Sequence, residues 1–180
     1  MGTHRNASSS PTSRVIGVHS LPMAVISLIK DQSVARGLVR DPLPEVTHAV
    51  RTEVAASSGR WFGRGRVRHA VTELLLTPEV LVVVDRDPER DGLDPDLQLT
   101  FHRLHQLEVT SEPEQGIGLL STPVGSTERS SRVVPSDGGP ETTRFRQALL
   151  EAAERSRGID VPATRLPDEA ESTSRSPEYS

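Results

Sequence analysis

The sequence predicts an α+β domain in which about six to seven short antiparallel strands form a small barrel or sandwich, with a C-terminal helix as its cap. Two observations support this fold class. One is an aliphatic, β-branched run over 73–85, interrupted by Thr77-Pro78-Glu79. The other is an amphipathic pattern over 140–157, after the last expected strand. We also expect two N-terminal helices before the strands.

The aliphatic run predicts two strands, Glu73–Thr77 and Val80–Asp85, that pair as a hairpin. Three consecutive valines, 82–84, are stiff at χ1 and pack better on a pleated sheet than in a helix. Pro78 has no amide hydrogen and therefore belongs in the turn or at a sheet edge. Because the second strand is apolar without strict alternation, we expect both of its faces to be covered, which makes it a central strand.

The region 140–157 shows the clearest helical pattern in the chain. Gly138-Gly139-Pro140 ends the preceding strand, Thr142 or Thr143 can cap the helix, and Gly158 can end it. The apolar side chains recur at helical spacing, at Phe145, Ala148, Leu149 and Ala152. We expect this stripe to insert into the open end of the barrel.

Two helices are predicted in the region 23–58. Residues 24–39 carry apolar residues near one face and are followed by Asp41-Pro42, which disfavours helix. Residues 45–57 carry a narrow apolar stripe and precede Gly59. Further strands are expected over 63–70, 97–110, 116–121 and 129–134, with a bulge or tight turn between Phe101 and Leu104.

Composition limits the size and chemistry of the domain. Of 180 residues, 34% are hydrophobic and 3% aromatic, so the core is small and aliphatic. The chain has no cysteine, which excludes disulfides and thiolate metal sites, and its net charge of −4 makes nucleic acid an unlikely partner. The expected organisation is a disordered tail over 1–22, a helical region over 23–58, a domain over 60–158 and a disordered tail over 159–180.

The apolar segment from Val15 to Ile29 is too short and too interrupted to span a membrane. No small-x-small cleavage site follows it before Lys30, which argues against an export signal. We therefore expect a cytoplasmic protein without a transmembrane segment. Translation could start at Met1 or at Met23, and the sequence leaves both open.

The candidate anion-binding surface consists of four arginines, Arg60, Arg64, Arg66 and Arg68. The last three alternate along an expected strand and would present their guanidinium groups on one face, where they could bind phosphate. The competing interpretation is an ordinary solvent-exposed strand face, because the chain contains twenty arginines and a single lysine. No catalytic, cofactor or metal signature is present, so enzymatic activity is uncertain and no cofactor is expected.

Three weaker patterns suggest sites that we do not predict. Asp87-x-Glu89-x-Asp91-Gly92 resembles the first half of a calcium loop, but Gln98 stands where the bidentate glutamate belongs. His102 and His105 would face opposite ways on a strand and so would not share a metal. An acid–base pair of His69 or His102 with Asp85 would require a pocket, and their spacing does not demand one.

The order of strands followed by one helix resembles a pleckstrin-homology-like domain of the bacterial or GRAM-related kind. The residues that support the resemblance are the hairpin 74–83 (LLLTPEVLVV) and the later segment 104–109 (LHQLEV). The family turn usually carries basic residues after its threonine, whereas this chain has Pro78-Glu79. The resemblance implies a non-enzymatic module that binds lipid head groups, peptides or partner proteins.

The alternative fold is the cone-shaped α+β class of nuclear-transport-factor-2-like proteins. In that class, N-terminal helices cover a curved sheet around a pocket, which the two helices expected before residue 58 would suit. This alternative implies a small pocket-type enzyme or ligand binder. The oligomeric state and the identity of any ligand are left open by the sequence.

Overall fold

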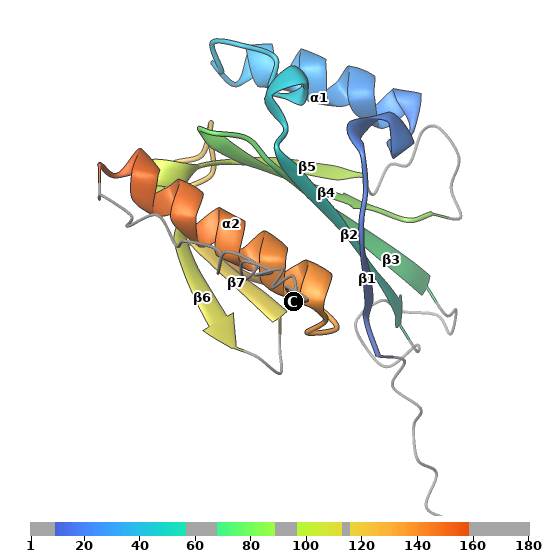
Figure 1. Ribbon diagram of the computed structural model, residues 1–180. Helices are drawn as coiled ribbons and strands as arrows, with labels where there is room; N and C mark the ends of the chain where they lie inside the picture. The colour runs from blue at the N-terminus through green and yellow to red at the C-terminus, as the bar shows by residue number, and fades with distance from the viewer. Residues whose placement is uncertain (1–9, 57–67, 89–96, 113–115, 159–180) are drawn as a thin grey trace, which may run out of the picture.

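The computed structural model of the protein describes residues 10–56, 68–88, 97–112 and 116–158. A five-stranded antiparallel sheet separates helix α1 on one face from helix α2 and a three-stranded antiparallel sheet on the other (Figure 1). The fold class is therefore α+β, as predicted.

The larger sheet consists of β1 (Thr12–Val15), β2 (His48–Ala56), β3 (Arg68–Leu76), β4 (Val80–Arg86) and β5 (Gln98–Arg103). The smaller sheet consists of β6 (Glu108–Glu112), β7 (Gly116–Ser121) and β8 (Ser130–Val134). The helices are α1 (Met23–Ala35) and α2 (Pro140–Ser156), with 3₁₀ turns η1 (Val18–Ser20), η2 (Leu43–Glu45) and η3 (Leu104–Gln106).

The predicted hairpin is confirmed in β3 and β4. The two strands pair from Val71↔Arg86 to Leu76↔Leu81, and the turn between them is organised by Thr77. The Thr77 hydroxyl accepts from the amide of Val80 at 2.9 Å and donates to the Val80 carbonyl. Strand β4 lies inside the sheet between β3 and β5, and its valines are buried on both faces.

The second predicted N-terminal helix is wrong, because residues 48–56 form strand β2. The segment alternates, with Ala49 and Arg51 on the α1 face and Val50 and Thr52 on the α2 face. β2 pairs with β3 along its whole length and with β1 over residues 50–53. Hydrogen bonding to strands on both sides stabilises this segment as a strand more than its weak apolar stripe could stabilise it as a helix. Its valine and threonine residues also favour a strand.

The expected disordered N-terminal tail is also wrong in part, because Thr12–Val15 form edge strand β1. The outward-facing amides of Ser13 and Val15 donate to the side chains of Asp137, at 3.0 Å, and Glu141, at 2.9 Å. Asp137 lies three residues before α2 begins, and Glu141 is in the first turn of that helix. The exposed edge of the sheet is therefore satisfied by side chains that lie more than a hundred residues later in the sequence.

The predicted break between Phe101 and Leu104 is present as a change of sheet. β5 ends at Arg103, the turn η3 follows, and β6 begins the smaller sheet at Glu108. Leu104 and Leu107 are buried at this corner, and the Leu104 amide donates to the carbonyl of Glu79. The corner thus anchors the second sheet to the turn of the central hairpin.

Helix α2 covers the opening between the two sheets, and its predicted apolar stripe is buried. Phe145 is 3% exposed and Leu149 is fully buried. They join a core cluster with residues of both sheets, including Leu81 and Leu119. The prediction of a closed barrel is wrong: among the described strands, no backbone pairing joins one sheet to the other. The helix fills the side on which a barrel would close.

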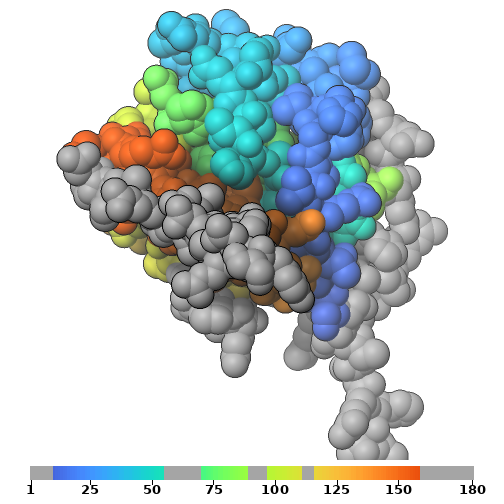
Figure 2. All heavy atoms as spheres, viewed as in Figure 1, coloured from blue at the N-terminus to red at the C-terminus, as the bar shows by residue number. Residues whose placement is uncertain are grey.

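A second core lies on the opposite face of the larger sheet. Leu21, Val25 and Ile29 of the N-terminal segment pack there against residues of β3, β4 and β5. In the space-filling view, α1 and the segment leading into β2 cover the top of the molecule (Figure 2). The apolar segment from Val15 to Ile29 is therefore part of the folded domain. Within the described part of the chain, no helix has the length and hydropathy needed to cross a membrane.

Candidate functional site

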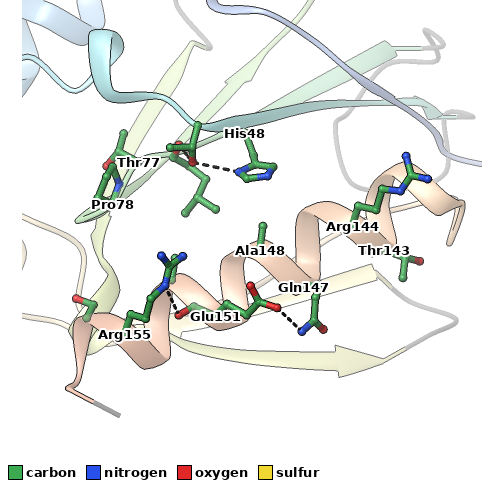
Figure 3. A pocket seen from close by; sticks show the side chains of 13 residues that line it. His48, Thr77, Pro78, Thr143, Arg144, Gln147, Ala148, Glu151 and Arg155 are labelled. Carbon is green, nitrogen blue, oxygen red and sulfur yellow. Dashed lines mark hydrogen bonds between the residues drawn. The ribbon is translucent and has the colours of Figure 1, made fainter. Parts of the chain in front are cut away.

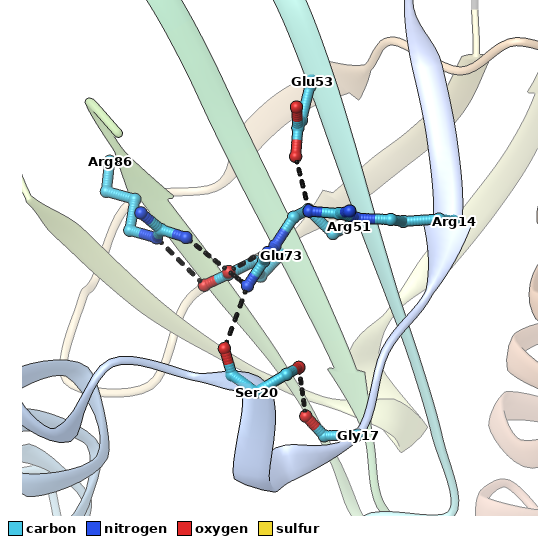
Figure 4. A network of polar contacts seen from close by, with 7 residues as sticks. All are labelled: Arg14, Gly17, Ser20, Arg51, Glu53, Glu73 and Arg86. Atoms are coloured by element: carbon cyan, nitrogen blue, oxygen red, sulfur yellow. Dashed lines mark hydrogen bonds and ion pairs between the residues drawn. The ribbon is translucent and has the colours of Figure 1, made fainter. Parts of the chain in front are cut away.

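A buried ion cluster lies on the α1 face of the larger sheet (Figure 4). The carboxylate of Glu73 is fully buried between the guanidinium groups of Arg51 and Arg86, at 2.7 and 3.0 Å. Arg51 also donates to the carbonyl oxygen of Ser20, which joins the N-terminal segment to the sheet. The charged groups of this cluster bind one another and a backbone carbonyl of the same chain, so we assign the cluster a structural role.

A second charge cluster joins the two sheets on the opposite face. The guanidinium of Arg132, on β8, donates with two nitrogens to the carboxylate of Asp85 on β4, which also accepts a hydrogen bond from Thr72. This bidentate ion pair links the two sheets, which share no backbone pairing among the described strands. Because the two charged groups in this cluster bind each other, we assign it a structural role as well.

His102 is buried at the same interface and is bonded to a neighbouring hydroxyl. Its Nδ1 atom lies 2.6 Å from Oγ of Ser121, at hydrogen-bond distance. Burial, with a smaller contribution from the positive charge of Arg132, lowers the pKa of His102 from 6.5 to about 4. The imidazole is therefore neutral at physiological pH.

The structure does not join His102 to Asp85 as an acid–base pair. Asp85 is held by Arg132, and the strand register places the two residues four positions apart along β4, which is roughly 13 Å. The side chain of His69, the other histidine considered for such a pair, lies outside the described residues. Neither His102 nor Asp85 lines the hollows described below.

An open groove runs between α2 and the adjoining ends of β2 and β3 (Figure 3). It has a volume of about 1060 Å³. One wall is formed by Thr47 and His48 at the start of β2, and Leu76 and Pro78 lie beside them. The other wall is the outer face of α2. We call this hollow the α2 groove; its helical lining consists of Thr143, Arg144, Gln147, Ala148, Glu151, Ala152, Arg155 and Ser156.

The α2 groove combines an apolar centre with basic ends. Ala148 lies between Arg144 and Arg155, which flank it along the helix (Figure 3). The side chain of Arg144 has no hydrogen bond or ion pair with any described residue, and the side chain of Arg155 donates only to the carbonyl oxygen of Glu151. The Glu151 carboxylate accepts from Gln147 at 2.8 Å. The groove therefore offers open guanidinium groups around a surface that apolar side chains can cover.

The predicted anion-binding surface is left untested. Arg60, Arg64 and Arg66 lie outside the described residues, and Arg68 is the first residue of β3, without a described side chain. The calcium-like loop lies mostly outside them as well. Across the ranges that the structure describes, no three histidine or acidic side chains are grouped so as to hold a metal ion.

Sequence reasoning missed the groove, although its signal is present in α2. The apolar stripe of Phe145 and Leu149 is buried as predicted, whereas Ala148, predicted in the same stripe, is only partly buried and also belongs to a neighbouring stripe that lines the groove. Arg144, Ala148, Glu151 and Arg155 follow one another at steps of four, three and four residues, which places them on one face. What the sequence could not show is that β2, expected to be a helix, forms the facing wall.

Comparison with known proteins gives no match: no family model fits the sequence, no curated protein is similar to it, and no solved structure matches it. Function is therefore argued from the geometry of the described residues alone.

Proposed function

We propose that this protein is a non-enzymatic binding module of pleckstrin-homology-like type, and that its α2 groove binds an extended acidic segment of a partner protein. The observation that carries the proposal is the open groove with an apolar centre between two uncommitted arginines. The antiparallel strands followed by one C-terminal helix support the type of module, because the resemblance rests on that order.

The basic ends of the groove set the charge of the proposed ligand. Guanidinium groups bind carboxylates through paired, charge-assisted hydrogen bonds, and Arg144 is free to form them. Glu151 lies between the two arginines and disfavours a carboxylate at the centre of the ligand. The preferred segment is therefore acidic at two separate positions and uncharged between them.

The geometry of α2 also sets the spacing of the acidic residues. Arg144 and Arg155 are eleven residues apart on a helix that rises 1.5 Å per residue, so their Cα atoms are separated by roughly 16 Å. An extended peptide advances about 3.3 Å per residue. Two acidic residues about five positions apart, with apolar residues between them, would therefore meet both arginines.

Selection of peptides from a random phage-displayed library tests the proposal. The wild-type protein is the bait, and the enriched peptides are then measured against the double variant Arg144→Glu, Arg155→Glu. We expect the enriched sequences to carry two acidic residues at the stated spacing, and we expect the double variant to bind them at least about tenfold more weakly.

The matched control is Arg103→Glu, which reverses the charge of an exposed side chain outside the groove. It should bind the enriched peptides as the wild type does. The proposal is overturned if no peptide family is enriched, or if the double variant and the control bind the peptides equally well.

A cytoplasmic location remains part of this proposal, since the apolar N-terminal segment packs into the core through Leu21, Val25 and Ile29. Binding of acidic lipid by Arg60, Arg64, Arg66 and Arg68 stays a prediction from the sequence, and the α2 groove does not depend on it.

A further inference from the structure

A second hollow lies away from the α2 groove, where α1, β5 and the loop before β8 meet. It has a volume of about 670 Å³. Three arginines from three separate parts of the chain line it: Arg36 just after α1, Arg103 at the end of β5, and Arg129 just before β8. Glu108 is the one acidic side chain in this lining.

Arg36 is held in place by the protein while part of its guanidinium group stays available. Its Nε atom donates to Oε1 of Gln32 at 3.1 Å, and its Cζ atom lies 5.8 Å from the centre of the Phe101 ring. Both contacts orient a long side chain that would otherwise lose entropy on binding. The two terminal nitrogens of Arg36 have no partner among the described residues.

A loop that lines the hollow, residues 122–126, is fixed to β5. The Val124 amide donates to the carbonyl of Phe101 at 2.8 Å, and the Ser126 amide donates to the carbonyl of Pro123. Gly125, between them, has a φ of +82°, which L side chains rarely adopt. A β-carbon at Gly125 would lie 3.6 Å from Cγ of Arg36, so the loop and this arginine pack together.

The remaining two arginines are exposed and differ in their partners. The side chain of Arg103 has no hydrogen bond or ion pair with any described residue. Arg129 pairs with Glu108, but both side chains are more than half exposed, and an exposed pair of this kind contributes about 1 kcal/mol or less. A ligand with two negative charges can therefore displace Glu108 from Arg129.

We propose that Arg36, Arg103 and Arg129 form a site for a phosphate-type dianion, either free phosphate or the phosphate of a lipid head group. Three guanidinium groups supply paired donors for the oxygens of one tetrahedral anion, and the positioned Arg36 reduces the ordering cost. The proposal is independent of the α2 groove, and either can fail without the other.

Titration of the ¹⁵N-labelled protein with inorganic phosphate, followed by amide chemical shifts at constant ionic strength, tests this site. We expect saturable shifts at Gly125 and Ser126. The variant Arg103→Gln should weaken binding by about tenfold, whereas Arg14→Gln, which changes an exposed arginine outside both hollows, should not alter it. Removing the competing carboxylate with Glu108→Gln should instead tighten binding.

The source of the phosphate is distinguished with vesicles. Phosphatidylcholine vesicles that contain phosphatidylinositol phosphate should retain the wild-type protein, and inorganic phosphate should compete, if the lipid head group is the ligand. Saturable phosphate binding without vesicle retention identifies the free anion. The proposal is overturned if the shifts do not saturate, if chloride reproduces them, or if Arg103→Gln and Glu108→Gln leave the affinity unchanged.

Discussion

The arginines of the core and those of the surface hollows show how differently one residue type is used in this protein. Arg51, Arg86 and Arg132 are directed at carboxylates of the protein itself, with Arg51 and Arg86 almost entirely buried. Arg103 and Arg144 line open hollows, and their side chains have no partner among the described residues. Buried, paired arginines hold the fold together, whereas exposed arginines that are unpaired or only weakly paired remain available to bind a ligand.

This difference identifies Glu73 as the residue whose loss should be most damaging. In Glu73→Ala, two guanidinium groups remain buried without their shared carboxylate, and we expect a loss of about 3–5 kcal/mol in the free energy of unfolding. Urea unfolding measures this loss. The matched control is Glu53→Ala, which removes an exposed partner of Arg14 and should cost less than about 1 kcal/mol. Equal losses for the two variants would show that the buried cluster has no special role.

Acid should destabilise the protein through His102. Its pKa is lowered to about 4 in the folded state, so only the unfolded chain takes up this proton as the pH falls below 6.5. Stability is complete above pH 6.5 and is lost progressively toward pH 4, by roughly 3 kcal/mol. Urea midpoints across this range should follow the fall, and His102→Gln should flatten it. A wild-type midpoint that stays constant would contradict the assignment of His102 as a buried neutral side chain.

The contacts between β1 and α2 should make a smaller contribution. Asp137 accepts hydrogen bonds from the amides of Gly139 and Ser13, chiefly the former, and these lower its pKa. This contribution is present above the usual carboxyl pKa and is lost as the pH falls through the lowered value. We expect Asp137→Ala with Glu141→Ala to cost about 1–2 kcal/mol. The amides of Ser13 and Val15 should then exchange faster, while that of Val83 should not; unchanged exchange would mean that the two carboxylates do not hold β1.

Much of the fold could be predicted because its signals are local. The valines of β4, the turn at Thr77 and the stripe of Phe145 and Leu149 each express their structure within a few residues. β1 and β2 could not be predicted in the same way. β1 is short and polar, and its outer edge is satisfied by carboxylates far away in the sequence.

The candidate sites were less predictable than the fold for the same reason. Arg60, Arg64 and Arg66 attracted attention because they alternate within one short segment, yet they lie outside the described residues. Arg36 and Arg103 are far apart in the sequence. They line the same hollow because Arg36, just after α1, packs against Phe101 of β5, the strand that ends at Arg103. In a chain with twenty arginines, the sequence does not reveal which ones are already paired.

The affinity of Arg144→Gln for a peptide selected on the wild-type protein is the most direct test of the proposed function. Arg144 is exposed and has no described partner, so its replacement should leave the urea midpoint unchanged. Isothermal titration should show binding about tenfold weaker than that of the wild type. Wild-type affinity in this variant would contradict the account, because the groove would then bind without the guanidinium group that defines its ligand.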